Sequence, residues 1–173
     1  MRKRLFVFIE GPDDDRFFEK AIKPICERKY NLVQKWQCSQ EPTKKIKEFL
    51  NSIKAMKADY FFLKDINNSP CATAKKEEIT NNYKKRINEV NIIIVIKEIE
   101  SWYLSGLDNR SCKEIGISPF NNTDEITKEH FNGLIPKKYD SRIDFMIEIL
   151  KRFSIETAKQ KNKSFNYFMT KVS

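Results

Sequence analysis

The chain has 173 residues, of which 40% are hydrophobic and 12% aromatic, and its formal net charge is +9. A chain of this length and composition can bury the core of one folded domain. Its apolar runs are far shorter than the roughly 18 residues of a transmembrane helix, and the apolar stretch 5–9 is too short for a signal peptide. We therefore expect a cytoplasmic protein without a membrane partner.

The pattern of reactive residues argues against several common kinds of active site. The four cysteines are scattered and form no C-x-x-C pair, which argues against zinc binding. His130 is the only histidine and has polar neighbours, so a nucleophile with a histidine base is not expected. The chain has neither G-x-x-x-x-G-K-S/T nor G-x-G-x-x-G, the motifs of P-loop and dinucleotide-binding proteins.

The positive charge is concentrated near the end of the chain and predicts binding to a polyanion. Residues 151–173 contain six Lys or Arg residues and one acid, Glu156, and so supply +5 of the total +9. We expect this segment to contact the phosphates and bases of a nucleic acid, DNA in particular. The candidate contact residues are Lys151, Arg152, Lys159, Lys161, Lys163 and Tyr167.

The first part of the chain alternates predicted strands and helices. Four apolar runs have the length and composition of strands, at 5–9, 31–36, 60–65 and 91–96. The last of these is β-branched nearly throughout, which suits the centre of a parallel sheet. The turn Gly11-Pro12 starts a helix that runs to about residue 28, and Asp13 suits its N-cap. Further helices are predicted from Thr43 and over 73–88.

The second part of the chain has less regular patterns. Residues 97–104 are predicted to form a short helix, whereas 105–140 are rich in Gly, Pro and Asn and are predicted to be irregular. Ser141 can cap a helix. The apolar residues of that helix are Ile143, Met146, Ile147, Leu150 and Phe153. A final helix has its apolar residues at i, i+3, i+4 and i+7, namely Phe165, Phe168, Met169 and Val172.

These elements predict an α/β protein with a Rossmann-like fold. Alternating strands and helices give a mostly parallel sheet of about four strands flanked by helices, followed by a helical C-terminal extension. We expect a single domain over 1–173, with a core at 1–105 and an irregular and helical extension at 106–173.

Carboxylates follow several of the predicted strands. Glu10 ends the first strand, Asp65 ends the third, and Glu98 and Glu100 follow the fourth; Asp13 lies close after Glu10. The carboxyl ends of parallel strands share one edge of a sheet, so these acids are expected to converge there. Convergent carboxylates repel one another unless a cation neutralises them, and their oxygen atoms suit Mg²⁺ or Mn²⁺. Glu98 and Glu100 share a face if the strand continues through them, but diverge on a helix.

Short motifs in the chain resemble those of Toprim proteins, which include topoisomerases, bacterial primases and nucleases of the overcoming-lysogenization-defect type. Residues 6–13, Phe-Val-Phe-Ile-Glu-Gly-Pro-Asp, are similar to the first Toprim motif, an apolar strand that ends in Glu-Gly with an acid shortly after. Residues 61–67 resemble the second motif, Asp-x-Asp, with Asn67 in place of the second Asp. Residues 96–104 and 163–168 are similar to the Glu-x-Glu-x-Trp-Leu-Leu and Ser-Phe-x-x-Phe segments of small stand-alone Toprim-like proteins.

The resemblance implies a Toprim fold and divalent-metal-dependent chemistry on phosphodiester bonds. By position it assigns Glu10 as general acid/base or metal ligand and Asp65 as the principal ligand of Mg²⁺. Asn67 would be a neutral and weaker ligand, and Glu98 and Glu100 would restore the missing negative charge.

Three functional hypotheses remain open. The first is a Mg²⁺- or Mn²⁺-dependent nuclease in which Glu10 and Asp65 are catalytic. The second is a non-catalytic Toprim-like module that binds nucleic acid or a partner protein and works with an ATPase; Asn67 favours this hypothesis. The third is a receiver-like signalling domain with Asp65 as phosphate acceptor, which requires a lysine after a fifth strand.

Overall fold

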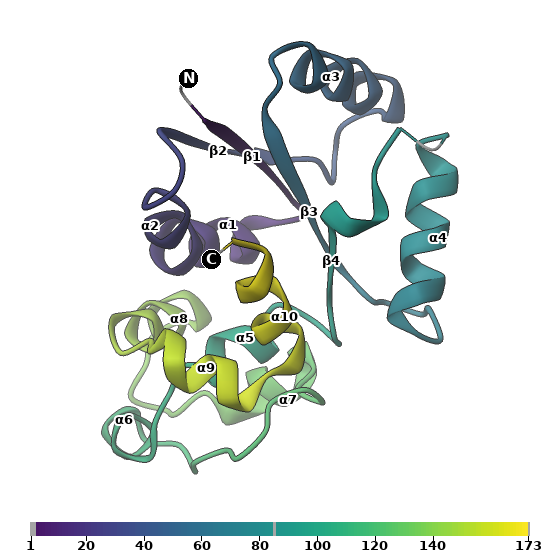
Figure 1. Cartoon of the computed structure of the whole chain (residues 1–173). Helices are drawn as coiled ribbons and strands as arrows, with labels where there is room; N and C mark the ends of the chain where they lie inside the picture. Colours follow the sequence, from purple (N-terminus) through teal and green to yellow (C-terminus); the bar gives the residue numbers. More distant parts are fainter. Residues whose placement is uncertain (1–2, 85, 173) are drawn as a thin grey trace. The chain divides into compact units, whose positions relative to one another are not determined.

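A computed structural model describes residues 3–84 and 86–172 of the chain (Figure 1). The polypeptide divides into two compact units, one that ends at Val95 and one that runs from Ile96 to Val172. The first unit ends before the predicted core boundary at residue 105, because the chain leaves the sheet directly after its fourth strand. A single-domain organisation stays a prediction.

The first unit is built on a sheet of four parallel strands in the order β2-β1-β3-β4, which confirms the predicted α/β class. The strands are β1 (Arg4–Ile9), β2 (Leu32–Gln37), β3 (Asp59–Asp65) and β4 (Ile92–Val95). The prediction that the β-branched strand lies at the centre is wrong, because β4 is an edge strand of this sheet. All its residues are nevertheless buried. Burial of a strand depends on what covers its faces, and not on how many strands it pairs with.

Helical segments connect these strands. They are α1 (Pro12–Phe17), the π-helical turn η1 (Phe18–Ile22), α2 (Lys23–Cys26), α3 (Thr43–Ala55), α4 (Ala72–Asn82) and the 3-10 turn η2 (Glu89–Asn91). The prediction of Asp13 as N-cap is wrong. Gly11 is the N-cap of α1, and its N–H donates to the Asp14 carboxylate at 3.2 Å. Pro12 has no N–H to satisfy and fits the first turn, so the helix begins there.

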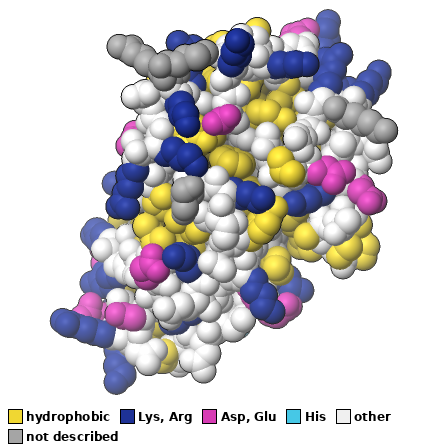
Figure 2. All heavy atoms as spheres, in the orientation of Figure 1, with side chains coloured by type: hydrophobic (Ala, Val, Ile, Leu, Met, Phe, Trp, Pro, Cys, Tyr) yellow, Lys and Arg dark blue, Asp and Glu magenta, His cyan; other side chains and the backbone are white. Residues whose placement is uncertain are grey.

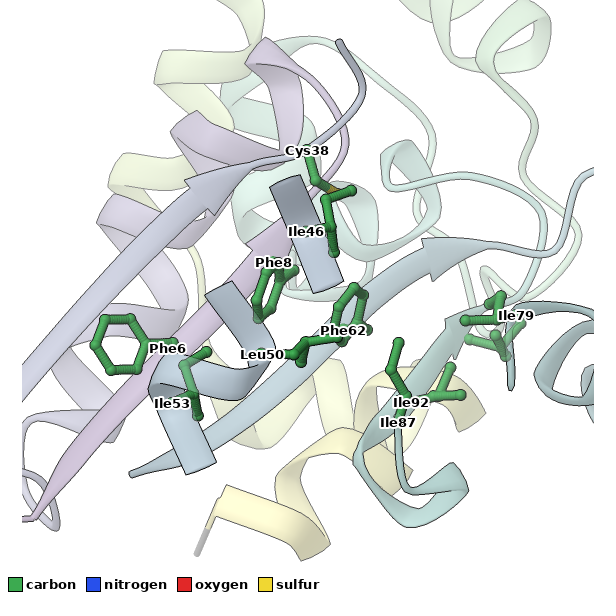
Figure 3. Packing of buried hydrophobic residues seen from close by; sticks show 11 residues of the cluster. Phe6, Phe8, Cys38, Ile46, Leu50, Ile53, Phe62, Ile79, Ile87 and Ile92 are labelled. Atoms are coloured by element: carbon green, nitrogen blue, oxygen red, sulfur yellow. The ribbon is translucent and has the colours of Figure 1, made fainter. Parts of the chain in front are cut away.

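One face of the sheet carries an aromatic and aliphatic cluster against α3 (Figure 3). Phe8 of β1 stacks on Phe62 of β3 with ring centroids 4.0 Å apart, and Ile46 of α3 belongs to the same cluster. Phe8 and Phe62 are also register partners in the sheet. Because side chains alternate between faces, the next residues on this face are Glu10 and Lys64. The apolar packing therefore decides which polar side chains emerge at the carboxyl edge.

The second unit is helical, as predicted for the C-terminal region. Its helices are α5 (Glu100–Ser105), α6 (Asn109–Ile115), α7 (Lys128–Leu134), α8 (Arg142–Lys151), α9 (Ile155–Lys161) and α10 (Lys163–Val172). The prediction that 105–140 is irregular is wrong for α6 and α7. Each has seven residues, too few to show an amphipathic repeat, although the caps Asp108 and Thr127 signal their beginnings.

The two longest helices of the second unit differ in how well the sequence predicts their buried face. The predicted stripe of α10 is confirmed, since all four of its apolar residues are buried. The apolar residues noted in the sequence of α8 are only partly buried: Ile143 and Ile147 are 49% and 40% exposed, whereas Phe145 and Ile149 are buried. Because α8 has apolar residues on both sides, either side could face the core, and packing against the other helices decides which side is buried. Within the described chain, no helix is long and apolar enough to cross a membrane.

Candidate functional site

Glu10 forms an ion pair with a lysine at the carboxyl edge of the sheet. Its Oε1 atom lies 2.9 Å from Nζ of Lys64, and the two side chains are 27% and 15% exposed. The register pairs Phe8 with Phe62, and Glu10 and Lys64 each follow two residues later, which brings them to the same face. Lys64 is a site residue that the sequence reasoning missed. The available signal was its position two residues after Phe62, on the same side of the strand.

Cys38 and Tyr83 lie near this ion pair and contribute to the pKa of Lys64. Burial opposes the positive charge of Lys64, but the negative charges that Cys38 and Glu10 can carry outweigh that effect and raise the pKa of Lys64. Burial also raises the pKa of Cys38 and of Tyr83. The Cys38 thiol donates to the backbone oxygen of Ile9 at 3.3 Å. These raised pKa values favour an ammonium group on Lys64 and a neutral thiol and phenol on Cys38 and Tyr83.

Asp65 lies at the same edge as Glu10 but on the other face of the sheet. It follows Lys64 in β3, and successive side chains of a strand point to opposite faces. The strand order predicted from the sequence thus brings Glu10 and Asp65 to neighbouring strands of one unit. It does not direct their carboxylates to a common point on one face.

Asn67 and Asp13 have local structural roles. Asn67 is exposed and adopts a left-handed backbone conformation with φ of 49°. Asn is more tolerant of this conformation than most other residues, which gives a structural reason for its presence in the turn. Asp13 pairs with Arg16 on its own helix at 2.9 Å.

Glu98 and Glu100 belong to the second unit and take part in its packing. Glu100 is the first residue of α5, and its buried carboxylate accepts a hydrogen bond from Nη2 of Arg142. The Arg142 Nε atom donates to Asn132 at 2.8 Å. Glu98 precedes α5 and accepts a hydrogen bond from the backbone N–H of Lys128, the first residue of α7. The strand does not continue through the two glutamates, so the condition for a shared face is not met.

Four of the residues predicted to hold Mg²⁺ or Mn²⁺ each have a partner of their own, namely Glu10, Asp13, Glu98 and Glu100. Among residues 3–84 and 86–172, no group of three or more His, Cys, Asp or Glu side chains could hold a metal ion. Glu10 already has an ammonium counter-charge, and Glu100 has a guanidinium. The oxygen ligands that Mg²⁺ requires are thus distributed over separate contacts.

The Trp-containing and Ser-Phe motifs meet in a buried hydrogen-bond network. The Trp102 indole N–H donates to Oγ of Ser164 at 2.8 Å, and that hydroxyl donates to Oδ1 of Asn162 at 2.8 Å. The Asn162 amide in turn donates to Ser101 at 3.3 Å and to Thr123 at 3.2 Å. Trp102, Ser101, Thr123 and Asn162 are all buried. Segments about 60 residues apart in the sequence are therefore joined by side chains that satisfy one another.

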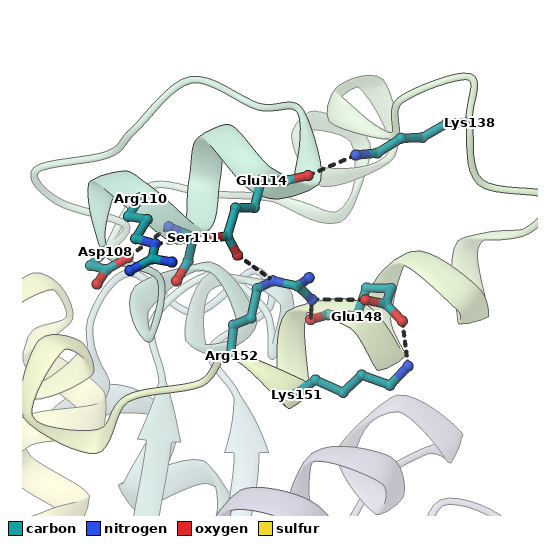
Figure 4. A network of polar contacts seen from close by, with 8 residues as sticks. All are labelled: Asp108, Arg110, Ser111, Glu114, Lys138, Glu148, Lys151 and Arg152. Carbon is teal, nitrogen blue, oxygen red and sulfur yellow. Dashed lines mark hydrogen bonds and ion pairs between the residues drawn. The ribbon is translucent and has the colours of Figure 1, made fainter.

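The beginning of the predicted basic segment is neutralised within its own unit (Figure 4). Arg152 bridges two glutamates, with Nε 3.2 Å from Glu114 and Nη1 2.7 Å from Glu148. Lys151 also pairs with Glu148. Hydrogen bonds from Lys151 and Arg152 lower the pKa of Glu148, and those from Arg110 and Arg152 lower the pKa of Glu114. These cations have acidic neighbours that a sequence-based count of charge cannot detect.

The remaining basic candidates differ in accessibility. Lys159 pairs with Glu156 at 3.2 Å, and the Lys161 ammonium donates to a backbone carbonyl before α6. Lys163 is 82% exposed in its side chain and lies 3.9 Å from Asp124. Tyr167 is partly exposed on α10, with the ammonium of Lys171 5.0 Å from its ring centre. Lys163 and Tyr167 are thus the candidates best placed to contact a ligand.

Comparisons with protein-family models, with curated proteins and with solved structures gave no match. The Toprim resemblance therefore stays a prediction that rests on the short motifs, and the fold itself is defined by the strand order and register.

Proposed function

We propose that this chain is a non-catalytic, Toprim-like module that binds nucleic acid, in which Lys64 supplies the positive charge that a divalent metal would supply beside Glu10. The observation that carries the proposal is the 2.9 Å ion pair between Glu10 and Lys64 at the carboxyl edge of the sheet. A cation that approached Glu10 would have to displace an ammonium group that belongs to the same chain and is held beside the carboxylate.

The charge of the chain supports the nucleic-acid part of the proposal. A net charge of +9 favours association with a polyanion, and such association weakens as salt concentration rises. That the chain works together with a partner ATPase stays a prediction. Such a partner would supply the energy of nucleotide hydrolysis to a module that by itself only binds nucleic acid.

The test measures metal binding and nucleic-acid binding on the same protein samples. Electron paramagnetic resonance of added Mn²⁺ should show no tight binding to the wild-type chain, and labelled DNA and RNA should bind in a salt-dependent way without being cleaved. Lys64→Met removes the ammonium and should raise the affinity for Mn²⁺, whereas the double variant Lys64→Met with Glu10→Gln should remove that gain. Tight Mn²⁺ binding by the wild-type chain that Lys64→Met does not alter would contradict the proposal.

A Mg²⁺- or Mn²⁺-dependent nuclease is the second candidate. The observation that favours it is that Glu10 and Asp65 end neighbouring parallel strands of one compact unit. It predicts cleavage of DNA or RNA by the wild-type chain with Mn²⁺, and loss of cleavage in Glu10→Gln and in Asp65→Asn. Equal cleavage by the wild type and both variants would indicate a contaminating nuclease and would reject this candidate.

A further inference from the structure

A hollow opens in the first unit at the end of the sheet opposite to Glu10 and Lys64. It has a volume of about 870 Å³ and lies between the end of α3, the beginning of β3 and the segment before β4. Tyr60 lines it, and Lys64 lies four residues further along β3, roughly 13 Å away at 3.3 Å per residue. The hollow is therefore separate from the carboxyl-edge site.

Basic side chains dominate the rim of this hollow. Lys54, Lys57 and Arg86 line it and are exposed, and Asp59 is the one acid that the lining contains. Within the described part of the chain, no ion pair engages these three cations. Asp59 accepts a hydrogen bond from Tyr30, and burial together with this carboxylate raises the pKa of that phenol. In Figure 2, Lys and Arg side chains gather over α3 at the top of the view.

Neutral hydrogen-bond donors add to the positive charge. The backbone N–H of Asn88 donates to the Tyr60 hydroxyl oxygen at 3.0 Å, which leaves the hydroxyl hydrogen for another acceptor. The Oδ1 atom of Asn88 accepts from Val90 at 3.1 Å, so its amide nitrogen can donate elsewhere. The Tyr60 ring is held at its edge by Phe8 and Phe62, with centroids 6.4 Å and 6.0 Å away. The packing of the Tyr60 ring against the aromatic core thus fixes the position of the Tyr60 hydroxyl and, through its hydrogen bond, of Asn88.

We propose that this hollow is a phosphate-binding site. Three cations and several N–H and O–H donors around an open cavity match the charge and the acceptor oxygens of a phosphate group. The contrast with Arg152, which is bridged by two glutamates, supports the assignment, because the cations of the hollow have no such competitors among the described residues. The phosphate belongs to a nucleic-acid strand or to a free nucleotide, and binding measurements with both probes separate these two sources. If the phosphate belongs to a nucleic-acid strand, the inference rests on the proposed function; if it belongs to a free nucleotide, the inference is independent of it.

The test replaces the cations of the hollow and compares the result with a charge-matched control. The hollow variant is Lys54→Gln with Lys57→Gln and Arg86→Gln. The control variant is Lys20→Gln with Lys29→Gln and Lys113→Gln, three exposed residues that do not line the hollow. Both variants lose the same charge, so a general effect of net charge is removed from the comparison. All six side chains are exposed, so both variants should fold, which circular dichroism and thermal unfolding would verify.

Two probes are titrated at several salt concentrations, a labelled single-stranded oligonucleotide and a fluorescent nucleoside triphosphate. Binding of the oligonucleotide should be at least about tenfold weaker for the hollow variant than for the control. The slope of log K against log salt should become shallower by about 0.7 for each phosphate group that the variant no longer neutralises. Selective loss of nucleotide binding, without an effect on the strand, would identify a nucleotide as the source.

The inference is overturned if the hollow and control variants bind both probes equally well, or if the wild type binds neither. The first outcome leaves nucleic-acid binding intact and so does not affect the proposed function. The second outcome contradicts both. Lys57→Gln alone provides a milder variant that should show a smaller effect in the same direction.

Discussion

Two glutamates predicted as metal ligands, Glu10 and Glu100, each pair with a cation, but in different surroundings. The side chains of Glu10 and Lys64 are 27% and 15% exposed at the open end of a sheet. Glu100 is 4% exposed, and its partner Arg142 is 24% exposed among packed helices. The first pair keeps a carboxylate accessible at the edge where α/β sheets bind ligands, whereas the second pair stabilises the arrangement of α5 and α8. A paired glutamate is therefore partly accessible to a ligand in the first unit, whereas in the second unit it serves as a buried structural contact.

The largest expected effect comes from removing the cation of the buried pair. Arg142→Met leaves the Glu100 carboxylate buried without its guanidinium and should lower the free energy of unfolding by about 3–5 kcal/mol. Lys64→Met is the matched control in the other unit and should cost less than about 1 kcal/mol, because Glu10 is partly exposed to water. Urea unfolding measures both. Equal losses would show that the two pairs do not differ in the way their exposure indicates.

A smaller loss is expected at the buried hydrogen-bond network of the second unit. Ser164→Ala removes the acceptor of the Trp102 indole N–H, and the free energy of unfolding should fall by about 1–3 kcal/mol. Thr170→Ala, which removes an exposed hydroxyl from the same helix, should change it by less than about 0.5 kcal/mol. Unfolding followed by tryptophan fluorescence distinguishes them, and similar values for the two variants would contradict a structural role of the network.

The ion pair of Glu10 and Lys64 should contribute to stability in a way that depends on pH in the alkaline range, where the lysine loses its proton. Glu10 helps to raise the pKa of Lys64, so Glu10→Gln should lower the pH at which the lysine loses its proton. A raised lysine pKa stabilises the fold below the unfolded value near about 10.4, and this stability is lost as pH rises through the folded value. Glu10→Gln should remove part of the stability that the raised pKa of Lys64 provides. Nuclear magnetic resonance of the lysine side chain measures the shift, and Glu41→Gln, beside the exposed Lys45, should leave Lys64 unchanged.

The smallest effect is expected at the surface ion pairs of the second unit. Lys151 and Arg152 lower the pKa of Glu148, so its contribution is present above the ordinary carboxyl value of about 4.5 and is lost as pH falls through the depressed value. Glu148→Gln should cost less than about 1 kcal/mol near neutral pH and approach the wild type in acid. Unfolding measured from neutral to acidic pH tests this, with exposed Glu129→Gln as control. A difference that persists at low pH would assign the effect to packing instead of charge.

The predictability of the fold differs between the two units for a physical reason. In the first unit, apolar runs of strand length alternate with helical segments, and all four strands could be predicted from their own sequence. In the second unit, α6 and α7 are too short to show a repeat, and α8 has apolar residues on two sides. Such helices are specified by what they pack against, and a local pattern does not contain that information.

The candidate site was predictable in its place but not in its chemistry. The alternation of strands and helices placed Glu10 and Asp65 at one edge of the sheet. The register of β1 with β3 could not be predicted from the separate strands, and it is the register that brings Lys64 to Glu10. The accessible positive charge of the C-terminal segment was also not predictable. Lys151 and Arg152 were predicted to contact nucleic acid, but folding places Glu148 and Glu114 beside them.

The sequence by itself determined the parallel α/β sheet, the apolar stripe of α10 and the edge at which acidic residues gather. These features depend on periodicity and on short-range order along the chain. Only the tertiary structure decided which cation neutralises each carboxylate, which face Asp65 occupies, and where three exposed cations surround a hollow. These features depend on distances between residues far apart in the sequence, and electrostatic and hydrogen-bond interactions act over a few ångströms in space.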